Sequence, residues 1–367
     1  MREERIVAEK VDEVIYNTDV YSLEDADFRA LRTELIGEYI EDLEAKCPTY
    51  ASYREAHHRS GGDTAEAPHV PTSVFKTIKL ISVADGNIDQ WCMSSGTLGS
   101  RSLIGRDRPS LERLLGSIRK SMALFEEWEE EELHVIHLGP TCEDAGDVWF
   151  PYVMGLTEIL YPTDSFASEN RLDIQGAINR YADLRSRNQK IGLIGAPFAV
   201  KMFCEAYQDG GFPAAARDQV AVVTGGGWKT HLGEAIAKPA FRRRIVDALG
   251  LSDETRVRDA FNQVELNTVL MECEQHAFHV PPWLMARAMC PRSLAPLPNG
   301  QPGLLAYIDA SASSYPCIIV GDDLGIVSDE PCPCGRPGDL LHLQRRIERG
   351  GDAGCAIALS QQFGRDA

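Results

Sequence analysis

The stretch Ser94-Ser95-Gly96-Thr97-Leu98-Gly99-Ser100 is the part of this sequence that says most about its fold. Glycines let backbone N–H groups approach an anion closely, and the hydroxyl groups add further donors, so such a loop can hold phosphate oxygens. A plain Ser/Gly turn would have the same composition. A hydrolase elbow is excluded, because the pattern Gly-x-Ser-x-Gly is missing. We therefore interpret Ser94–Gly99 as a candidate phosphate loop.

Around this loop, apolar strand-like runs alternate with helical patterns along the chain. The expected strands are Leu133–Leu138, Ile191–Ile194, Val220–Val223, Leu304–Ile308 and Cys317–Val320. The expected helices cover 23–46, with Ser22 as a candidate N-cap, and 110–129, 173–187 and 197–208. Residues 54–70, which include His57 and His58, are expected to form a polar loop. The alternation predicts an α/β protein with mostly parallel sheets.

A glycine-rich turn, Gly225-Gly226-Gly227-Trp228-Lys229, follows the expected strand Val220–Val223 and Thr224. Three glycines at the end of a strand allow a flat ring or a phosphate to lie against the backbone, although a tight structural turn is the alternative. The turn is not a P-loop, because that pattern requires glycine where this chain has Val223 and Trp228.

An acidic turn, Gly321-Asp322-Asp323-Leu324-Gly325, follows the expected strand Cys317–Val320. A carboxylate at the end of a strand can accept hydrogen bonds from both hydroxyl groups of a ribose. An Asp-rich structural turn is the alternative interpretation.

A group of cysteine and histidine residues suggests a metal site. Cys273 and His279, together with Cys332 and Cys334, offer the three thiolates and one imidazole of a closed tetrahedral zinc site. His276 is a competing ligand, and Cys-x-Cys is tighter than the usual Cys-x2-Cys spacing. Buried free cysteines are the alternative.

The composition excludes several other classes of protein. A net charge of −18 argues against duplex nucleic acid as a partner, because phosphate neutralisation needs clustered Lys and Arg. No apolar stretch approaches the roughly 20 residues that span a bilayer. The start, MREERIVAEK, has no signal-peptide core. We therefore expect a cytoplasmic chain without a membrane partner, whose ten cysteines are mostly reduced.

In their order along the chain, these motifs resemble those of the adenylate-forming superfamily of acyl- and aryl-CoA ligases. The resemblance is closest to the acyl-protein synthetases of bacterial bioluminescence, and phenylacetate–CoA ligases are more distant. It runs from about Val70 to Ala356. It implies an adenylation core of layered αβ sheets with a small β subdomain over 70–335. A helical region over 1–69 would precede this core, and a truncated C-terminal lobe over 336–367 would follow it.

The resemblance assigns the nucleotide contacts. Ser94, Ser95, Gly96, Thr97 and Gly99 are similar to the family's phosphate loop, with Leu98 in place of a threonine and Ser102 where many members carry lysine. Gly225, Gly226 and Gly227 look like the adenine-binding turn, and Asp323 matches the ribose-binding aspartate.

The segment Phe261-Asn262-Gln263-Val264-Glu265 resembles the motif Tyr-Gly-x-Thr-Glu, whose glutamate helps to hold Mg²⁺. Only Glu265 is identical. Cys332 to Arg336 is similar to a segment found in both subfamilies, and Cys273 with His279 resembles a zinc-binding pair of phenylacetate–CoA ligases. The resemblance therefore implies Mg²⁺ at Glu265 and a structural Zn²⁺ at the Cys/His group.

Many members stabilise the adenylation transition state with a lysine on a C-terminal domain, whereas the last lysine here is Lys238. We expect Arg346 or Lys229 to replace it. In the bioluminescence synthetases a cysteine near the C-terminus accepts the acyl group, and Cys355 fits that place, next to Arg345, Arg346 and Arg349. A free buried cysteine is the alternative.

The implied activity is ATP-dependent conversion of a carboxylic acid to an acyl-adenylate, followed by acyl transfer to a thiol. The acyl pocket is expected within His137–Met154 and around Phe261. Two alternatives stay open. One is a ligase that delivers to coenzyme A, a carrier protein or an amine, and the other is a non-catalytic nucleotide-binding scaffold.

Overall fold

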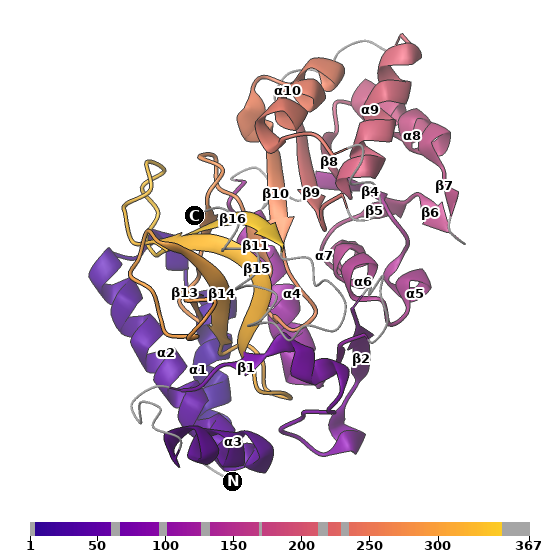
Figure 1. Cartoon of the computed structure of the whole chain (residues 1–367). Coiled ribbons are helices and arrows are strands. Elements are labelled where there is room, and N and C mark those ends of the chain that lie inside the picture. The colour runs from indigo at the N-terminus through magenta and orange to yellow at the C-terminus, as the bar shows by residue number, and fades with distance from the viewer. Residues whose placement is uncertain are drawn as a thin grey trace.

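The computed structural model describes residues 4–59, 67–94, 101–125, 133–168, 171–211, 219–228 and 235–346, with side chains from residue 10 onward. Two six-stranded sheets dominate this part of the chain, one mainly parallel and one mainly antiparallel. Figure 1 shows the parallel sheet with its helices in one half of the molecule and the antiparallel sheet beside the N-terminal helices in the other. No helix in the described ranges is long and apolar enough to cross a bilayer.

The parallel sheet has the order β11-β10-β9-β8-β4-β5, and only β11 runs antiparallel to its neighbour. Its strands are β4 (Leu133–Leu138), β5 (Thr163–Ser165), β8 (Lys190–Gly195), β9 (Val220–Gly225), β10 (Val257–Phe261) and β11 (Leu270–Met271). On one face the sheet packs against α8 (Ile174–Ser186), α9 (Pro197–Asp209) and α10 (Lys238–Leu249). The strands of this sheet are apolar along their length because helices and a second hydrophobic core cover the two faces of the sheet.

The second sheet has the order β12-β16-β15-β14-β13, with β1 paired in parallel to β15. Its strands are β1 (Val70–Pro71), β12 (Phe278–His279), β13 (Leu284–Met289), β14 (Pro302–Asp309), β15 (Ile318–Ser328) and β16 (Leu340–Arg346). The prediction of mostly parallel sheets is therefore wrong for Leu304–Ile308 and Cys317–Val320. The connection between β14 and β15 is too short for the crossover that parallel neighbours need. β16 lies beyond the expected boundary at residue 335 and pairs with β15.

Three helices precede β1: α1 (Glu4–Asn17), α2 (Asp25–Lys46) and α3 (Pro48–Arg59). The predicted cap at Ser22 is wrong, because α2 starts at Asp25 and the Ser22 hydroxyl donates to Asp19 instead. The predicted polar loop is also wrong over 54–59, where His57 and His58 form the last turn of α3. Proline at the first position starts that helix, and no breaker follows it before residue 60.

The remaining strands and α-helices lie between β1 and α8 along the chain. They are β2 (Gln90–Met93), β3 (Leu103–Arg106), α4 (Arg108–Met122), α5 (Cys142–Ala145), α6 (Trp149–Gly155), α7 (Thr157–Leu160), β6 (Ala167–Ser168) and β7 (Arg171–Leu172). Asp107 caps α4 by accepting the N–H of Ser110 at 3.0 Å. The expected helix 110–129 ends earlier, at Met122, and residues 126–132 lie outside the described part.

A buried arginine at the end of β3 joins these parts. Arg106 Nε donates to Asn267 Oδ1 at 2.9 Å, and its Nη2 donates to the carbonyl oxygens of Val264 at 2.7 Å and Leu266 at 3.3 Å. Its guanidinium carbon lies 3.7 Å from the centroid of the Trp149 ring. One side chain thus holds the segment that contains Glu265 against β3 and α6.

Asn267 extends this network to the antiparallel sheet. Its backbone N–H donates to Asp309 Oδ2 at 3.1 Å, and its side-chain amide donates to the carbonyl oxygens of Ser110 at 2.9 Å and Ser311 at 3.1 Å. The hydroxyl of Ser311 donates to Asp309 Oδ1 at 2.6 Å. The end of β14, the start of α4 and the segment after β10 are therefore fixed together by buried hydrogen bonds.

We predict that Arg106→Met lowers the free energy of unfolding by about 3 kcal/mol or more, because two buried carbonyl groups and one amide lose their donor while the stem volume is retained. Urea denaturation measures the change. Arg108→Met is the matched control, since the Arg108 side chain is 80% exposed and should change the midpoint little. Equal midpoints for the Arg106 variant and the wild type would contradict the central role of this side chain.

Candidate active site

The two ends of the candidate phosphate loop are held together. The N–H of Ser94 donates to the Ser102 carbonyl at 3.1 Å, and the N–H of Ser102 donates to Ser94 Oγ at 3.0 Å. These bonds continue the pairing of β2 with β3. Of the predicted phosphate contacts only Ser94 is described, and Ser95, Gly96, Thr97 and Gly99 lie outside the described residues.

The candidate adenine turn begins where β9 ends. Gly226 and Gly227 have positive φ angles of 75° and 64°, a left-handed conformation that glycine adopts without strain. A Cβ atom added to Gly226 would lie 2.5 Å from ring atoms of Phe150. Only glycine therefore lets this ring lie so close to the turn. Lys229 is outside the described residues.

The motif segment 261–265 leaves the end of β10, the strand next to β9. Asn262 shapes it: its side-chain amide donates to the carbonyl oxygens of Leu266 at 3.1 Å and Thr268 at 2.8 Å, and its Oδ1 accepts from the Trp149 indole. Asn262 therefore stabilises the conformation of its own loop. Sequence comparison of the motif alone would not have found this role, because the partners are backbone groups.

Glu265 is only 5% exposed, and burial raises the pKa of its carboxyl group. The Ser102 hydroxyl and the charge of Arg346 oppose that rise, and Asp322 adds to it. Arg346 faces Asp323 across the register of β15 and β16. Burial also raises the pKa of Asp323, with Arg346 again opposing. The structure thus brings together Glu265, Asp323 and Arg346, which are far apart in the sequence.

Gln263 is a polar residue of this site that the motif comparison passed over. Its side chain is 8% exposed, and its Nε2 has no hydrogen-bond partner within the described ranges. A Cβ atom at Gly321 would lie 3.5 Å from Gln263 Oε1, so the amide lies beside the acidic turn. Buried amide donors are nearly always paired, which makes this group available to a bound molecule.

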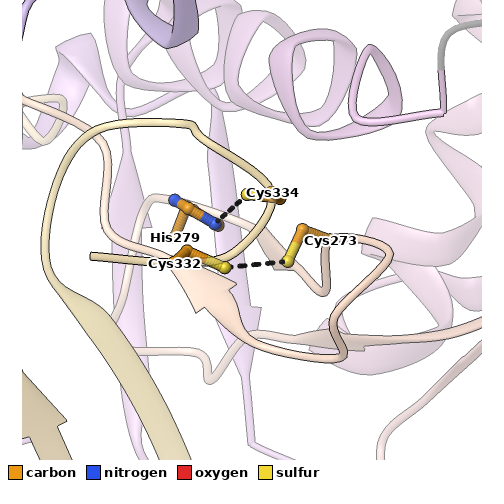
Figure 2. Close-up of side chains that lie close together, drawn as sticks. All are labelled: Cys273, His279, Cys332 and Cys334. Atoms are coloured by element: carbon orange, nitrogen blue, oxygen red, sulfur yellow. Dashed lines mark hydrogen bonds between the residues drawn. The ribbon is translucent and has the colours of Figure 1, made fainter. Parts of the chain in front are cut away.

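The Cys/His group comes together as the sequence predicts. Figure 2 shows Cys273, His279, Cys332 and Cys334 around one point. Their candidate ligand atoms all lie within 4.8 Å of one another. The Sγ atoms of Cys273 and Cys332 are 3.8 Å apart, and Cys334 Sγ lies 3.2 Å from His279 Nε2. The site joins the segment after β11 to the connection between β15 and β16.

The surroundings of His279 fit a metal ligand. Its Nδ1 lies 3.1 Å from the carbonyl oxygen of Pro337, an arrangement that leaves Nε2 as the free lone pair facing the thiols. Burial lowers the pKa of His279 and so favours the neutral ring. The alternative ligand His276 does not belong to the group, because its Nδ1 lies 3.6 Å from Glu272 Oε2 instead. Three thiols and one imidazole match the closed tetrahedral donor set of zinc.

A family model described as acyl-protein synthetase, LuxE, matches residues 1–364. The long-chain-fatty-acid–luciferin-component ligase of Aliivibrio fischeri is 36% identical over 361 residues, which are 98% of this chain and 96% of that protein. The ligase of the same description from Vibrio harveyi is 38% identical over 301 residues, which are 82% of this chain and 79% of that protein.

Solved structures of adenylate-forming ligases share the fold. A 2-hydroxyisobutyryl-CoA ligase in complex with 2-HIB-AMP and CoA has a TM-score of 0.63 at 15% identity, with coverage of 88% of this chain and 68% of that one. A long-chain-fatty-acid–CoA ligase from Archaeoglobus fulgidus has a TM-score of 0.52 at 10% identity, with coverage of 71% and 52%. The expected fold class is confirmed.

The raised pKa of Glu265 predicts how the stability of the protein depends on pH. The folded state favours the protonated carboxyl group, so this residue stabilises the fold at pH below its ordinary pKa of 4.5 and loses that contribution as the pH rises. Without nucleotide and Mg²⁺, Glu265→Gln should be more stable than the wild type at pH 8, and the difference should shrink towards pH 4.5. Urea denaturation at both pH values checks this, and a difference independent of pH would contradict it.

Proposed function

Because this chain belongs to the LuxE family of acyl-protein synthetases, we propose that its acid is a long-chain fatty acid and that its own Cys355 receives the acyl group. As a ligase of this family, the protein activates a carboxylic acid with ATP and transfers the acyl group to a thiol. The full-length family match carries this conclusion. The names of the two bacterial relatives support the choice of a long-chain acid.

The described residues near the ends of β4, β9 and β10 suit an uncharged acyl chain. His137 is buried, and burial lowers its pKa to about 4, so the ring is neutral at physiological pH. Phe150 lies against Gly226, and the Phe261 ring lies 6.4 Å from that of Tyr307. None of these side chains would place a formal charge against a fatty acyl group.

In the proposed first step the carboxylate attacks the α-phosphate of ATP in line, and pyrophosphate leaves. Catalysis of such a step is mainly positioning and neutralisation of charge. Segment 94–99 would hold phosphate oxygens, Gly225–Gly227 would receive the adenine, and Asp323 would accept the ribose hydroxyls. Arg346, opposite Asp323 in the sheet, would place a positive charge at the nucleotide.

Glu265 is the proposed Mg²⁺ ligand. Its carboxylate is the hard oxygen donor that Mg²⁺ prefers, and bound metal would supply neutralisation of phosphate charge. The buried carboxyl group has a raised pKa, so a nearby cation would favour its ionised form. The Ser102 hydroxyl and Arg346 already act in that direction.

In the proposed second step the Cys355 thiolate attacks the carbonyl carbon of the acyl-adenylate. A C–S bond forms, the C–O bond to the phosphate breaks, and AMP leaves with the bonding electrons. Cys355 lies outside the described residues, as do Arg349 and Lys229. Arg345 and Arg346 end the last described strand, and positive charge near the thiol would favour the thiolate.

We also propose that the Cys/His group holds a structural zinc ion, since four protein ligands leave no position open for water. Protein prepared without chelator should contain about one zinc per chain by elemental analysis. Cys332→Ser should lower the zinc content and the melting temperature. Cys290→Ser is the matched control, since Cys290 is a half-buried cysteine outside the group. Zinc-free wild-type protein would refute the assignment.

Incubation with ATP, Mg²⁺ and a long-chain fatty acid should leave an acyl group on the protein that hydroxylamine removes. Cys355→Ser should keep ATP–pyrophosphate exchange but carry no such thioester, because only the second step needs the thiol. ATP–pyrophosphate exchange measures the formation of the acyl-adenylate, and labelling of the protein with radiolabelled acid measures the transfer to the thiol.

Two controls make this test specific. Glu265→Gln should lose pyrophosphate exchange as well as labelling, whereas Cys290→Ser should retain both. If Cys355→Ser still forms the hydroxylamine-labile adduct, Cys355 is not the acceptor. Transfer of the label to coenzyme A or a carrier protein would then identify the alternative acceptor.

A further inference from the structure

Four charged side chains form a compact group between the end of the parallel sheet and α10. Lys238 Nζ lies 2.6 Å from Asp259 Oδ2 and 3.7 Å from Glu272 Oε1. Arg242 Nη2 donates to both carboxylate oxygens of Glu272, at 2.8 and 2.7 Å. Two carboxylates and two cations balance one another, and none of the four belongs to a motif that the proposed reaction uses.

Asp259 connects this charge group to the candidate adenine turn. The hydroxyl of Thr224 donates to Asp259 Oδ1 at 3.0 Å, and the two residues are partners in the register of β9 and β10. Thr224 directly precedes Gly225. A Cβ atom at Gly225 would lie 3.3 Å from the Ala260 carbonyl oxygen, so the two strands approach closely at this point. A displacement of Asp259 would therefore shift the start of the turn.

Glu272 connects the four charged side chains to the Cys/His group. It precedes Cys273 in the chain, and its Oε2 accepts the backbone N–H of Asp259 at 2.9 Å. The side chain of Glu272 is only 3% exposed. Its position thus depends on the segment that carries Cys273, and the backbone of Asp259 depends on Glu272.

No single charged side chain of this group can be removed without a large loss of stability. Removal of one member leaves a buried charge without its partner, which is far more costly than loss of an exposed ion pair. The path Thr224–Asp259–Glu272–Cys273 is therefore a stiff connection between the glycine turn and the Cys/His group.

We propose that the Asp259–Glu272 pair is a positioning device that fixes the Gly225–Gly227 turn for nucleotide binding and makes its geometry depend on the Cys273 segment. The effect of this pair on nucleotide binding rests on the proposed adenine site. Lys238 and Arg242 anchor the pair to α10. The two carboxylates would not contact the nucleotide themselves.

A double-mutant cycle on the full chain tests this path. Thr224→Val removes one hydroxyl with little change of shape, and Glu272→Gln removes one charge. Each should weaken binding of Mg·ATP about fivefold by calorimetry, and the double variant should bind no more than about tenfold more weakly than wild type, because both changes break the same path. The kcat of pyrophosphate exchange should stay within about twofold, since neither residue acts at the reacting atoms.

Asp12→Asn is the matched control, because it breaks a partly buried ion pair to Arg113 between α1 and α4, away from this path. It should bind Mg·ATP as the wild type does. Single variants with wild-type affinity, or effects that multiply in the double variant, would overturn the proposal.

A readout without nucleotide separates this proposal from the proposed function. Amide hydrogen exchange over residues 219–228 should be faster in Glu272→Gln and Thr224→Val than in the wild type, and unchanged in Asp12→Asn. Unchanged exchange in the two path variants would overturn the positioning role. If the wild type fails to bind Mg·ATP, the adenine-site assignment fails, and the exchange data alone decide whether the pair positions the turn.

Discussion

Buried guanidinium donors need protein acceptors. Arg106 directs its Nε and Nη2 donors to Asn267 and to the carbonyl groups of Val264 and Leu266, whereas its buried Nη1 has no hydrogen-bond partner within the described residues. The carbonyl groups of Val264 and Leu266 turn inward to reach it, and Trp149 covers its face. Glu265 lies between those two carbonyl groups in sequence. The position of the proposed metal ligand is thus set by backbone acceptors on either side of it.

The same constraint explains how two sheets of different type form one site. The parallel sheet brings the ends of β9 and β10 side by side, as parallel strands in register do. The antiparallel sheet brings Asp323 next to Arg346. Asn267, held by Arg106 and Asp309, joins the two. Asn267 thereby links the sheet that ends in the glycine turn to the sheet that carries Asp323.

The sequence identified the strands well where burial alone decides them. Leu133–Leu138 forms β4 because a strand covered on both faces is apolar throughout. It did not predict the direction of β14 and β15, which depends on the length of their connection. The Cys/His group was found because its residue types are chemically distinctive. Arg106 was missed because its acceptors lie about 160 residues away, and they are backbone carbonyls and an asparagine that no local pattern marks.

The expectation that Arg346 or Lys229 stabilises the adenylation transition state can be reconsidered in these terms. Lys238, the last lysine of the chain, lies against Asp259 and Glu272, and their charges raise its pKa against the effect of burial. Its charge already balances Asp259 in a group where Arg242 balances Glu272, so moving Lys238 to a phosphate would leave one buried carboxylate uncompensated. Arg346 faces Asp323 and influences Glu265, two groups that would themselves contact nucleotide or Mg²⁺. Of the two described cations Lys238 and Arg346, Arg346 is therefore the one whose neighbours belong to the proposed reaction.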